Sequence, residues 1–491
     1  MTSISQPERA TQNHVAALFR DELGYRHLGN WSGRAGNSCI EESLLAPFLA
    51  ASGCSPAQIS RALHALRTEA NHPDRSLYAS NQAVYSLLCY GVPVKLEAGA
   101  VTETVHLIDW NRPEKNDFAI AEEVTLKGGL ARRPDIVLYV NGIAIGMMEL
   151  KNSRVSIGDG IRQSLSNQQP EFNAAFFSTV QLVLAGNDSE GLRYGTTGTS
   201  EKFFLSWKED EADNERNKLD KYLLKLCNKP RLIELMRDFV LFDGGIKKLP
   251  RVHQYFGMKA AQAHAAQKKG GILWHTQGSG KSILMVLLAR WILVNNPHAR
   301  VAVITDRDEL DDQIKRVFLD AGETMHRTRS GRDLMARLAE PTPRLLCSLV
   351  HKFGLEARGK KDRAFEDFID ELEAQPSVAV GEVFVFVDEC HRTQGGRLNR
   401  VMKAMLPNAV FIGFTGTPLL KADKATSLEV FGGYIHTYKF SEAVQDKVVL
   451  DLAYEARDID QKLGTTGQID QWFDAKTQGL NDWQKDELKK Q

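Results

Sequence analysis

The sequence predicts an α/β protein whose second half is a doubly wound parallel sheet and whose first half mixes strand-like and helix-like segments. After residue 250, short β-branched apolar runs alternate with helical patterns, as a parallel sheet covered on both faces requires. Nearer the amino terminus, an Asn-Gly pair between two apolar runs indicates a hairpin. The charged segment Lys208 to Lys221 is almost free of apolar residues, and we interpret it as a solvated helix or loop between the two units.

The composition is that of a globular protein and narrows the functional classes. A chain of 491 residues is expected from its length to form about three domains. Hydrophobic residues make up 43% and charged residues 25%, which excludes a wholly disordered chain. Lys and Arg total 62 and Asp and Glu total 62, so the chain is no histone-like polycation, although a local basic groove could still bind nucleic acid.

Cysteine usage and apolar runs predict a cytosolic protein. The six cysteines form no CxxC pair and no Cys/His cluster, which favours a reducing compartment and no structural zinc. The amino-terminal residues MTSISQPERATQNH are polar and do not resemble a signal peptide. The most apolar stretch, Ser282 to Val294, is interrupted by Arg290 and is too short to cross a bilayer, so we expect no membrane association.

Residues 132–151 (RRPDIVLYVNGIAIGMMELK) predict a β-hairpin that presents paired carboxylates. Asn141–Gly142 favours a type I′ turn. Asp135 begins one strand, and Glu149 and Lys151 end the other, two residues apart and therefore on one face. Two carboxylates held together need a cation, and Mg²⁺ accepts such a pair. The metal would activate water and stabilise charge on phosphate oxygens, while Lys151 would position the nucleophile or neutralise the transition state.

The register of this hairpin predicts an irregularity. A strict two-residue turn pairs Asp135 with Met148, which puts Asp135 and Glu149 on opposite faces. One extra residue restores the pairing, and Gly146 is the natural place for it. We therefore predict a bulge or an irregular strand start at Gly146.

The second unit combines a parallel sheet with a phosphate-binding turn. We expect its strands at GGILWH, RVAVIT, PRLLCSL, EVFVFVD and AVFIGFT, near Ile272, Val303, Leu346, Phe386 and Ile412. Residues 275–282 (HTQGSGKS) stand between the first of these strands and a long apolar helix, which is the context of a P-loop. His275 occupies the place of the pattern's first glycine, as in the variant loop of helicase-type motors.

The P-loop residues predict an ATP site. Backbone N–H groups of the turn would cradle phosphate oxygens, and Gly278 and Gly280 allow that close approach. Lys281 would reach the β- and γ-phosphates, and the Ser282 hydroxyl would ligate Mg²⁺. The nucleotide-binding candidates of the turn are Thr276, Gln277, Gly278, Ser279, Gly280, Lys281 and Ser282.

The segment VFVFVDECH predicts the other half of this nucleotide site. Asp388, Glu389 and His391 stand at the carboxyl end of a strongly apolar strand, where open α/β sheets bind ligands. Asp388 can hold Mg²⁺, and Glu389 can orient or deprotonate the attacking water. We place His391 among the nucleotide-binding candidates.

The order of these motifs resembles that of superfamily-two helicases. RVHQ, TDRDELDDQ, SLVHKF and GFTGTP accompany the P-loop and DECH in the family's order. The resemblance implies that Gln254 reads adenine with Arg251 nearby, and that the segments around Arg307 and Lys352 touch the DNA backbone. It also implies that three residues couple ATP hydrolysis to DNA, namely Thr415, Gly416 and Thr417.

PD followed by ELK resembles the PD-(D/E)xK nuclease core, a mixed sheet with helices. The resemblance implies catalytic roles for Asp135, Glu149 and Lys151. GIRQSLSNQ resembles the helix that carries a QxxxY motif in restriction nucleases. Gln163 fits that motif, but Asn167 stands at the tyrosine position, so either that role is lost or a neighbour such as Gln168 substitutes. NSCIEESLLAPFL resembles the first helix of the core, whose acidic residue is Glu41 or Glu42.

Together the motifs resemble the R subunit of type I restriction enzymes over about residues 35–455. The resemblance implies an endonuclease domain at 1–225, a helical linker at 226–250, a RecA-like helicase lobe at 251–440, and a linker or truncated second lobe at 441–491. In that family the R subunit joins methyltransferase and specificity subunits. The complex uses ATP and Mg²⁺ to translocate double-stranded DNA and to cleave it away from an unmethylated site.

The carboxyl end departs from the family. After GFTGTP the family has a second RecA-like lobe with arginine fingers and then a helical domain, whereas Asp451 to Gln491 carries no such motif. NDWQKDELKK is at most a solvated helix. We therefore expect an amino-terminal fragment that binds ATP weakly and hydrolyses it poorly, because a trans arginine contributes several orders of magnitude in rate.

Three alternatives stay open on the sequence alone. A stand-alone helicase could keep the motor motifs while Asp135, Glu149 and Lys151 serve only in folding. A type III-like or other antiviral helicase–nuclease would place its nuclease after the motor, which the motif order disfavours. The third alternative is a non-enzymatic, nucleotide-switched DNA-binding scaffold.

Overall fold

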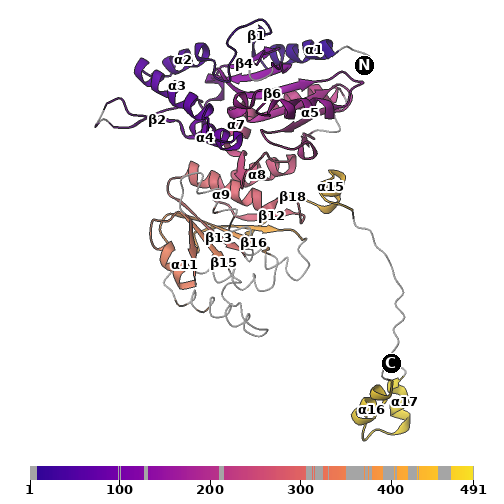
Figure 1. Cartoon of the computed structure of the whole chain (residues 1–491). Coiled ribbons are helices and arrows are strands. Elements are labelled where there is room, and N and C mark those ends of the chain that lie inside the picture. The colour runs from indigo at the N-terminus through magenta and orange to yellow at the C-terminus, as the bar shows by residue number, and fades with distance from the viewer. Residues whose placement is uncertain are drawn as a thin grey trace. The chain divides into compact units, whose positions relative to one another are not determined.

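A computed structural model describes most of the chain, which divides into two compact units (Figure 1). The first unit is Met1–Val448 and the second is Val449–Gln491. The described residues are 8–97, 101–126, 131–209, 215–305, 325–329, 331–349, 379–390, 406–417, 431–451 and 466–489, with a few single positions between these ranges.

The first half of the first unit is built on a mixed seven-stranded sheet in the order β1-β4-β5-β6-β7-β8-β9. The pairs β1·β4 and β6·β7 are parallel, and the other neighbours are antiparallel. β5 and β6 are buried along their whole length, so both faces of the sheet are covered there. The strands are β1 (Arg26–Asn30), β4 (Phe118–Glu122), β5 (Ile136–Val140), β6 (Ile143–Leu150), β7 (Leu182–Asn187), β8 (Gly191–Gly195) and β9 (Leu205–Ser206).

The predicted hairpin and its bulge are both present. Asn141 and Gly142 have φ values of 52° and 81°, the two positive angles that a type I′ turn requires. Leu138 pairs with Gly146, but the next residue, Tyr139, pairs with Ala144, so one residue of β6 is extra. That residue is Ile145, so the predicted bulge is confirmed, one residue before the predicted position at Gly146.

Helices and short elements surround this sheet, and several begin at capping residues. Ser55 and Gln58 form a capping box at the start of α3, and Ser76 and Ser156 accept backbone N–H groups at the starts of α4 and α5. The helices are α1 (Glu8–Asp21), α2 (Glu42–Ala51), α3 (Pro56–Ala70), α4 (Leu77–Tyr90) and α5 (Ile157–Asn167). The shorter elements are the hairpin of β2 (Val92–Val94) and β3 (Glu103–Val105) and the 3₁₀ turns η1 (Pro113–Lys115), η2 (Ala174–Ser178) and η3 (Glu201–Phe203).

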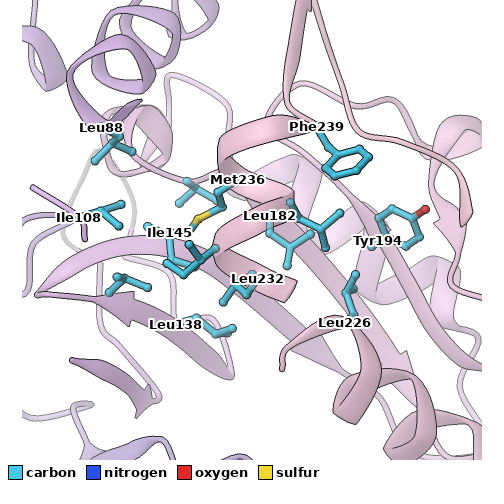
Figure 2. Close-up of a cluster of buried hydrophobic side chains, with 14 of the residues drawn as sticks. Leu88, Ile108, Leu138, Ile145, Leu182, Tyr194, Leu226, Leu232, Met236 and Phe239 are labelled. Carbon is cyan, nitrogen blue, oxygen red and sulfur yellow. The ribbon is translucent and has the colours of Figure 1, made fainter. Parts of the chain in front are cut away.

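The apolar core of this half draws on the segment that follows the charged stretch. Figure 2 shows Leu138 and Ile145 of the hairpin in one buried cluster with Leu232 and Met236. The last two come from α7 (Lys229–Asp238), which follows α6 (Lys218–Leu226). Because α7 fills the same core as the sheet, residues after 225 help to hold the first domain together.

The segment expected to be a helical linker contains α7 followed by a hairpin, β10 (Leu241–Asp243) and β11 (Ile246–Lys248). The helical expectation is therefore wrong for its second half. α7 ends at Asp238, and Gly244 and Gly245, whose φ values of 56° and 89° are both positive, form the turn between β10 and β11. Lys247 anchors the hairpin, because its buried Nζ donates hydrogen bonds to Asn81 Oδ1 (2.7 Å) and Gln181 Oε1 (2.5 Å).

The second half of this unit is an all-parallel seven-stranded sheet in the order β14-β15-β13-β16-β17-β12-β18. The five strands predicted from the sequence are confirmed, and β14 and β18 extend the sheet at its two edges. The strands are β12 (Gly271–His275), β13 (Ala299–Thr305), β14 (Met325–Thr328), β15 (Leu345–Leu349), β16 (Glu382–Asp388), β17 (Val410–Thr415) and β18 (Tyr434–Tyr438). The described helices here are α8 (Val252–Ala266), α9 (Lys281–Asn295), α11 (Gly331–Leu338) and α15 (Phe440–Gln445).

The second unit contains two described helices, α16 (Thr466–Lys476) and α17 (Asp482–Lys489). The predicted carboxyl-terminal helix is therefore confirmed. Among the described residues, no helix is both long enough and apolar enough to span a bilayer.

We expect Gly142→Ala to destabilise the protein by more than Gly198→Ala, as measured by urea unfolding. Both glycines have a φ of +81°, but a Cβ at Gly142 would lie 2.7 Å from Glu41 O and from Leu44 Cβ, whereas nothing lies within 4 Å at Gly198. Gly198→Ala should therefore show the cost of the backbone conformation alone, about 1–2 kcal/mol. Equal losses for the two variants would contradict the steric role of Gly142.

Candidate functional site

The predicted nuclease residues meet where β5 begins and β6 ends. The bulge continues the register so that Asp135, before Ile136, stands opposite Glu149, after Met148. The N–H of Leu150 donates a 2.6 Å hydrogen bond to Asp135 Oδ2. Asp135 and Glu149 therefore share the edge of the sheet that the sequence predicted.

Both carboxyl groups are held in a poorly solvated position. Glu149 is fully buried, which raises its pKa well above its ordinary value, and the charge of Asp135 raises it further. Burial also raises the pKa of Asp135 to about 6, although the hydrogen bond from Leu150 N–H opposes that shift. Only one oxygen of Glu149 is hydrogen-bonded, since Oε2 has no partner among the described residues.

Lys151 contacts a carboxylate that the motif search missed. Its Nζ donates a 2.6 Å hydrogen bond to Glu8 Oε1, at the start of α1. Burial alone would lower the pKa of Lys151, but Glu8, Asp135 and Glu149 outweigh burial and raise it. Glu8 precedes Lys151 by more than a hundred residues, and no motif in the sequence links the two.

Helix α1 also borders the site along its next turns. Gln12 donates to the backbone oxygen of Asp135 (3.1 Å) and to Glu122 Oε2 (3.2 Å). Glu122 in turn lies 2.9 Å from His27 Nε2. The first turns of α1 thus complete one wall of the candidate nuclease site through side-chain contacts.

Helix α5 brings Asn167 to the site and leaves the other candidates outside it. Asn167 Nδ2 donates a 3.0 Å hydrogen bond to Glu149 Oε1. Gln163 lies half-buried on α5, and among the described residues it has no hydrogen bond to the site carboxylates. Gln168 donates to Ser164 O and accepts from Gly198 N, so its amide is engaged with the backbone and not with the site carboxylates.

The two acidic candidates near α2 are engaged in ion pairs with other residues. Glu41 is buried, pairs with Arg34 at 2.6 Å, and accepts a hydrogen bond from Ser38 N. Glu42 is paired with Arg67 at the surface. Glu8 of α1, rather than either of these, contacts a nuclease candidate.

The P-loop lies where the sequence predicted it, between β12 and α9. Gly278 and Gly280 have φ values of 81° and 87°, which favour glycine, and Gly280 caps α9. Lys281 and Ser282 are the first two residues of that helix. Ser279 Oγ donates a 2.6 Å hydrogen bond to Thr276 O and closes the turn, while Gln277 is exposed.

The GFTGTP turn lies directly against the P-loop. A Cβ on Gly416 would lie 2.8 Å from Lys281 Nζ and 3.3 Å from Gln277 N, so a side chain here would displace the end of the lysine. Thr415 is buried, and its Oγ1 donates to Thr417 O (3.1 Å) within the turn. The turn proposed to couple hydrolysis to DNA is thus within reach of the phosphate lysine.

Gln254 contacts the P-loop backbone. Its Nε2 donates to Ser279 O (3.1 Å), and its Oε1 accepts from Arg251 N (2.8 Å) at the start of α8. His275, at the place of the pattern's first glycine, is buried and lies 2.9 Å from His436 Nδ1 through its Nε2. His275 therefore packs behind the turn.

The acidic residues of DECH stand at the carboxyl end of β16. Asp388 Oδ2 lies 3.4 Å from Thr305 Oγ1 at the end of neighbouring β13. Glu389 is buried and has a φ of 47°, an unusual conformation for a residue with a side chain. Arg307, Lys352 and His391 lie outside the described residues.

A cleft of about 500 Å³ separates the segment around β8 and β9 from α8, β18 and α15. Lys208 crosses it and contacts Asp446 at 3.2 Å, and Asp446 accepts a 2.8 Å hydrogen bond from Tyr438. The Tyr438 ring stacks on His253 at 3.8 Å, and His253 Nε2 lies 3.0 Å from Ser279 O in the P-loop. Side-chain contacts thus connect the first sheet's domain to the P-loop.

Comparison with known proteins finds two families along the chain. The type I restriction enzyme R protein N terminus matches residues 5–202, and the SWI2/SNF2 ATPase matches residues 253–486. The HindI endonuclease subunit of Haemophilus influenzae, a type I restriction enzyme, is 30% identical over 425 residues, which cover 77% of this chain and 39% of that protein. The putative MjaIXP endonuclease subunit of Methanocaldococcus jannaschii is 27% identical over 453 residues, which cover 84% and 42%.

The solved SWI2/SNF2 ATPase core of Sulfolobus solfataricus, in complex with dsDNA, matches 43% of this chain and 40% of its own at 12% identity and a TM-score of 0.29. This chain spans less than half the length of the two curated relatives. The residues that match the first family include the carboxylate hairpin, and those that match the second include the P-loop. The chain therefore belongs to the type I restriction enzyme R proteins, in which an amino-terminal nuclease domain precedes a SWI2/SNF2-type ATPase lobe.

Proposed function

We propose that this chain provides the motor and nuclease functions of a type I restriction system, with ATP-dependent DNA translocation and Mg²⁺-dependent cleavage of double-stranded DNA. The observation that carries the proposal is the bulged hairpin, which brings the half-buried Asp135 and the buried Glu149 together at one edge of the sheet, with Lys151 next along the chain from Leu150. The same chain carries a P-loop in contact with a GFTGTP turn.

The nuclease centre fits a hard divalent cation. Asp135 and Glu149 supply carboxylate oxygens, and Glu149 Oε2 is buried without a partner among the described residues. No group of three His, Cys, Asp or Glu side chains with metal-site geometry occurs in the described part of the chain. Two carboxylates suit Mg²⁺, which keeps several water ligands and binds substrate phosphate.

Each nuclease residue has a separate role in the proposed reaction. Bound Mg²⁺ would lower the pKa of water and stabilise negative charge on the scissile phosphate. Asp135 and Glu149 would hold the cation, and the N–H of Leu150 fixes the orientation of the Asp135 carboxylate. Lys151 is kept protonated by its carboxylate neighbours and places positive charge where the phosphate charge develops.

The ATPase lobe would bind the nucleotide with residues around the P-loop. The turn and the start of α9 present N–H groups to the phosphates, and Lys281 and Ser282 are placed to contact phosphate and Mg²⁺. Asp388 ends β16 and Glu389 follows it at the same edge of the sheet, where they would hold the metal and orient water. Gln254 and Arg251 start α8 beside the P-loop and are placed to recognise adenine.

The proposed partners follow from the family. The curated relatives are endonuclease subunits of type I restriction enzymes, and we infer that this chain also assembles with methyltransferase and specificity subunits. Double-stranded DNA is the proposed substrate, contacted in part through the segments around Arg307 and Lys352 and through Thr415, Gly416 and Thr417. The intact carboxylate pairing argues against the alternative of a helicase with a degenerate nuclease domain.

We expect Lys151→Ala to slow strongly the cleavage of unmethylated plasmid by the chain together with methyltransferase and specificity subunits, ATP and Mg²⁺. Loss of the positively charged lysine side chain should slow cleavage by at least about a hundredfold, while ATP hydrolysis continues. Lys248→Ala, at a lysine paired with Asp243 in the β10–β11 hairpin, is the matched control and should cleave normally. Unchanged cleavage by Lys151→Ala would remove Lys151 from the mechanism.

Gly416→Ala should weaken binding of a fluorescent ATP analogue, measured by anisotropy. The added Cβ would displace Lys281 Nζ, and a misplaced lysine loses a charge-assisted contact of about 1.5–3 kcal/mol, or about tenfold or more in affinity. Gly433→Ala is the control, because nothing lies within 4 Å of its added Cβ. Equal affinities for the two variants would show that the GFTGTP turn does not support the P-loop lysine.

Without metal, Asp135→Asn should raise the melting temperature at neutral pH. Folding raises the pKa of Asp135 from its ordinary value of 3.8 to about 6. The wild type therefore loses stability as the pH rises from about 4 to about 6, and it does not regain that stability at higher pH. The difference in melting temperature between the variant and the wild type, measured in EDTA, should therefore shrink as the pH falls from 6 towards 4. The exposed Asp74→Asn should show no such trend, and parallel curves for Asp135→Asn and wild type would refute the burial penalty.

A further inference from the structure

One face of α5 lies against the buried Glu149. Gly160, Ser164 and Asn167 follow one another at spacings of four and three residues and therefore share that face. A Cβ on Gly160 would lie 3.6 Å from Glu149 Cβ and 3.4 Å from Ala185 Cβ, so α5 approaches β6 and β7 closely here. The helix thus brings two polar side chains, Ser164 and Asn167, to a buried carboxylate.

Several buried polar atoms on this face have no hydrogen-bond partner among the described residues. The Asn167 amide donates to Glu149 Oε1 at 3.0 Å. Glu149 Oε2, Asn167 Oδ1 and Ser164 Oγ are all buried without a partner, and they are three of only eight such side-chain atoms among the described residues. Buried polar atoms in folded proteins are almost always hydrogen-bonded. Three unpartnered atoms on facing elements therefore indicate a place built for a polar ligand.

We propose that Asn167 is a positioning residue for the metal ligand Glu149. Its amide N–H holds Oε1, which leaves Oε2 for a divalent cation, while Asn167 Oδ1 and Ser164 Oγ bind water molecules of the hydrated cation. The proposal rests on the nuclease function proposed above.

The chemistry of the amide explains how an asparagine can fill this role at the position that a tyrosine occupies in the QxxxY motif. An amide carries both a donor and an acceptor, so it orients the carboxylate on one side and binds water on the other. Groups that hydrogen-bond a metal ligand fix its orientation and tune its affinity for the metal. Gln163 does not share this role, because it lies half-buried on α5 without a hydrogen bond to Glu149.

The test is Mn²⁺ binding by the full chain, measured by isothermal titration calorimetry without nucleotide. Glu149→Gln should abolish binding at the nuclease site and thereby identifies that site in the titration. The nearly isosteric Asn167→Leu should weaken Mn²⁺ binding by about 10- to 100-fold, as loss of a partner of a metal ligand typically does. Ser164→Ala should weaken it several-fold without lowering the melting temperature in EDTA, because the removed hydroxyl has no partner among the described residues.

The control is Asn116→Leu, at an asparagine that is also buried but hydrogen-bonds the loop around Asp109. It should lower the melting temperature and leave Mn²⁺ affinity unchanged. Wild-type affinity in both Asn167→Leu and Ser164→Ala, with binding lost in Glu149→Gln, would overturn the proposal. Equal binding by wild type and Glu149→Gln would instead refute the metal site of the proposed function. If Asn167→Leu does not fold, Ser164→Ala decides the outcome.

Discussion

The extra residue Ile145 determines which side chains face each other at the candidate nuclease site. Without it, the side chains of β6 beyond the bulge would exchange faces relative to β5, and Glu149 would point away from Asp135. Ile145 is fully buried and packs in the apolar core with Leu138 and Leu182 (Figure 2). The bulge is therefore held by hydrophobic burial, and the carboxylate pairing depends on the core of the domain.

The same burial gives the carboxylates their unusual electrostatics. Desolvation disfavours charge on Glu149 and Asp135, and Lys151 and the N–H of Leu150 compensate only in part. The fold thus holds two acidic groups at the edge of a sheet where a cation would relieve their repulsion. Glu8 joins them from α1, so the site draws charged groups from the amino-terminal helix as well as from the hairpin.

The ATPase lobe and the nuclease domain are connected by specific contacts within one compact unit. Lys208, Asp446, Tyr438 and His253 form a continuous path that reaches the Ser279 carbonyl in the P-loop. The path combines an ion pair, a hydrogen bond and a ring stack, which are directional interactions that respond to small displacements. It connects the segment that follows β9 to the P-loop through named side chains.

Local patterns in the sequence determined the hairpin, its bulge, the five predicted strands and the P-loop, because turns, alternation and glycine conformations are set by neighbouring residues. The hairpin at Gly244 and Gly245 was also locally encoded, although the helical pattern around it obscured the signal. Only the tertiary structure decided that Glu8 meets Lys151, that Asn167 holds Glu149, and that Glu41 is paired with Arg34. Such contacts join residues on separate elements, and their geometry depends on how helices pack on the sheet, which no single stretch of sequence specifies.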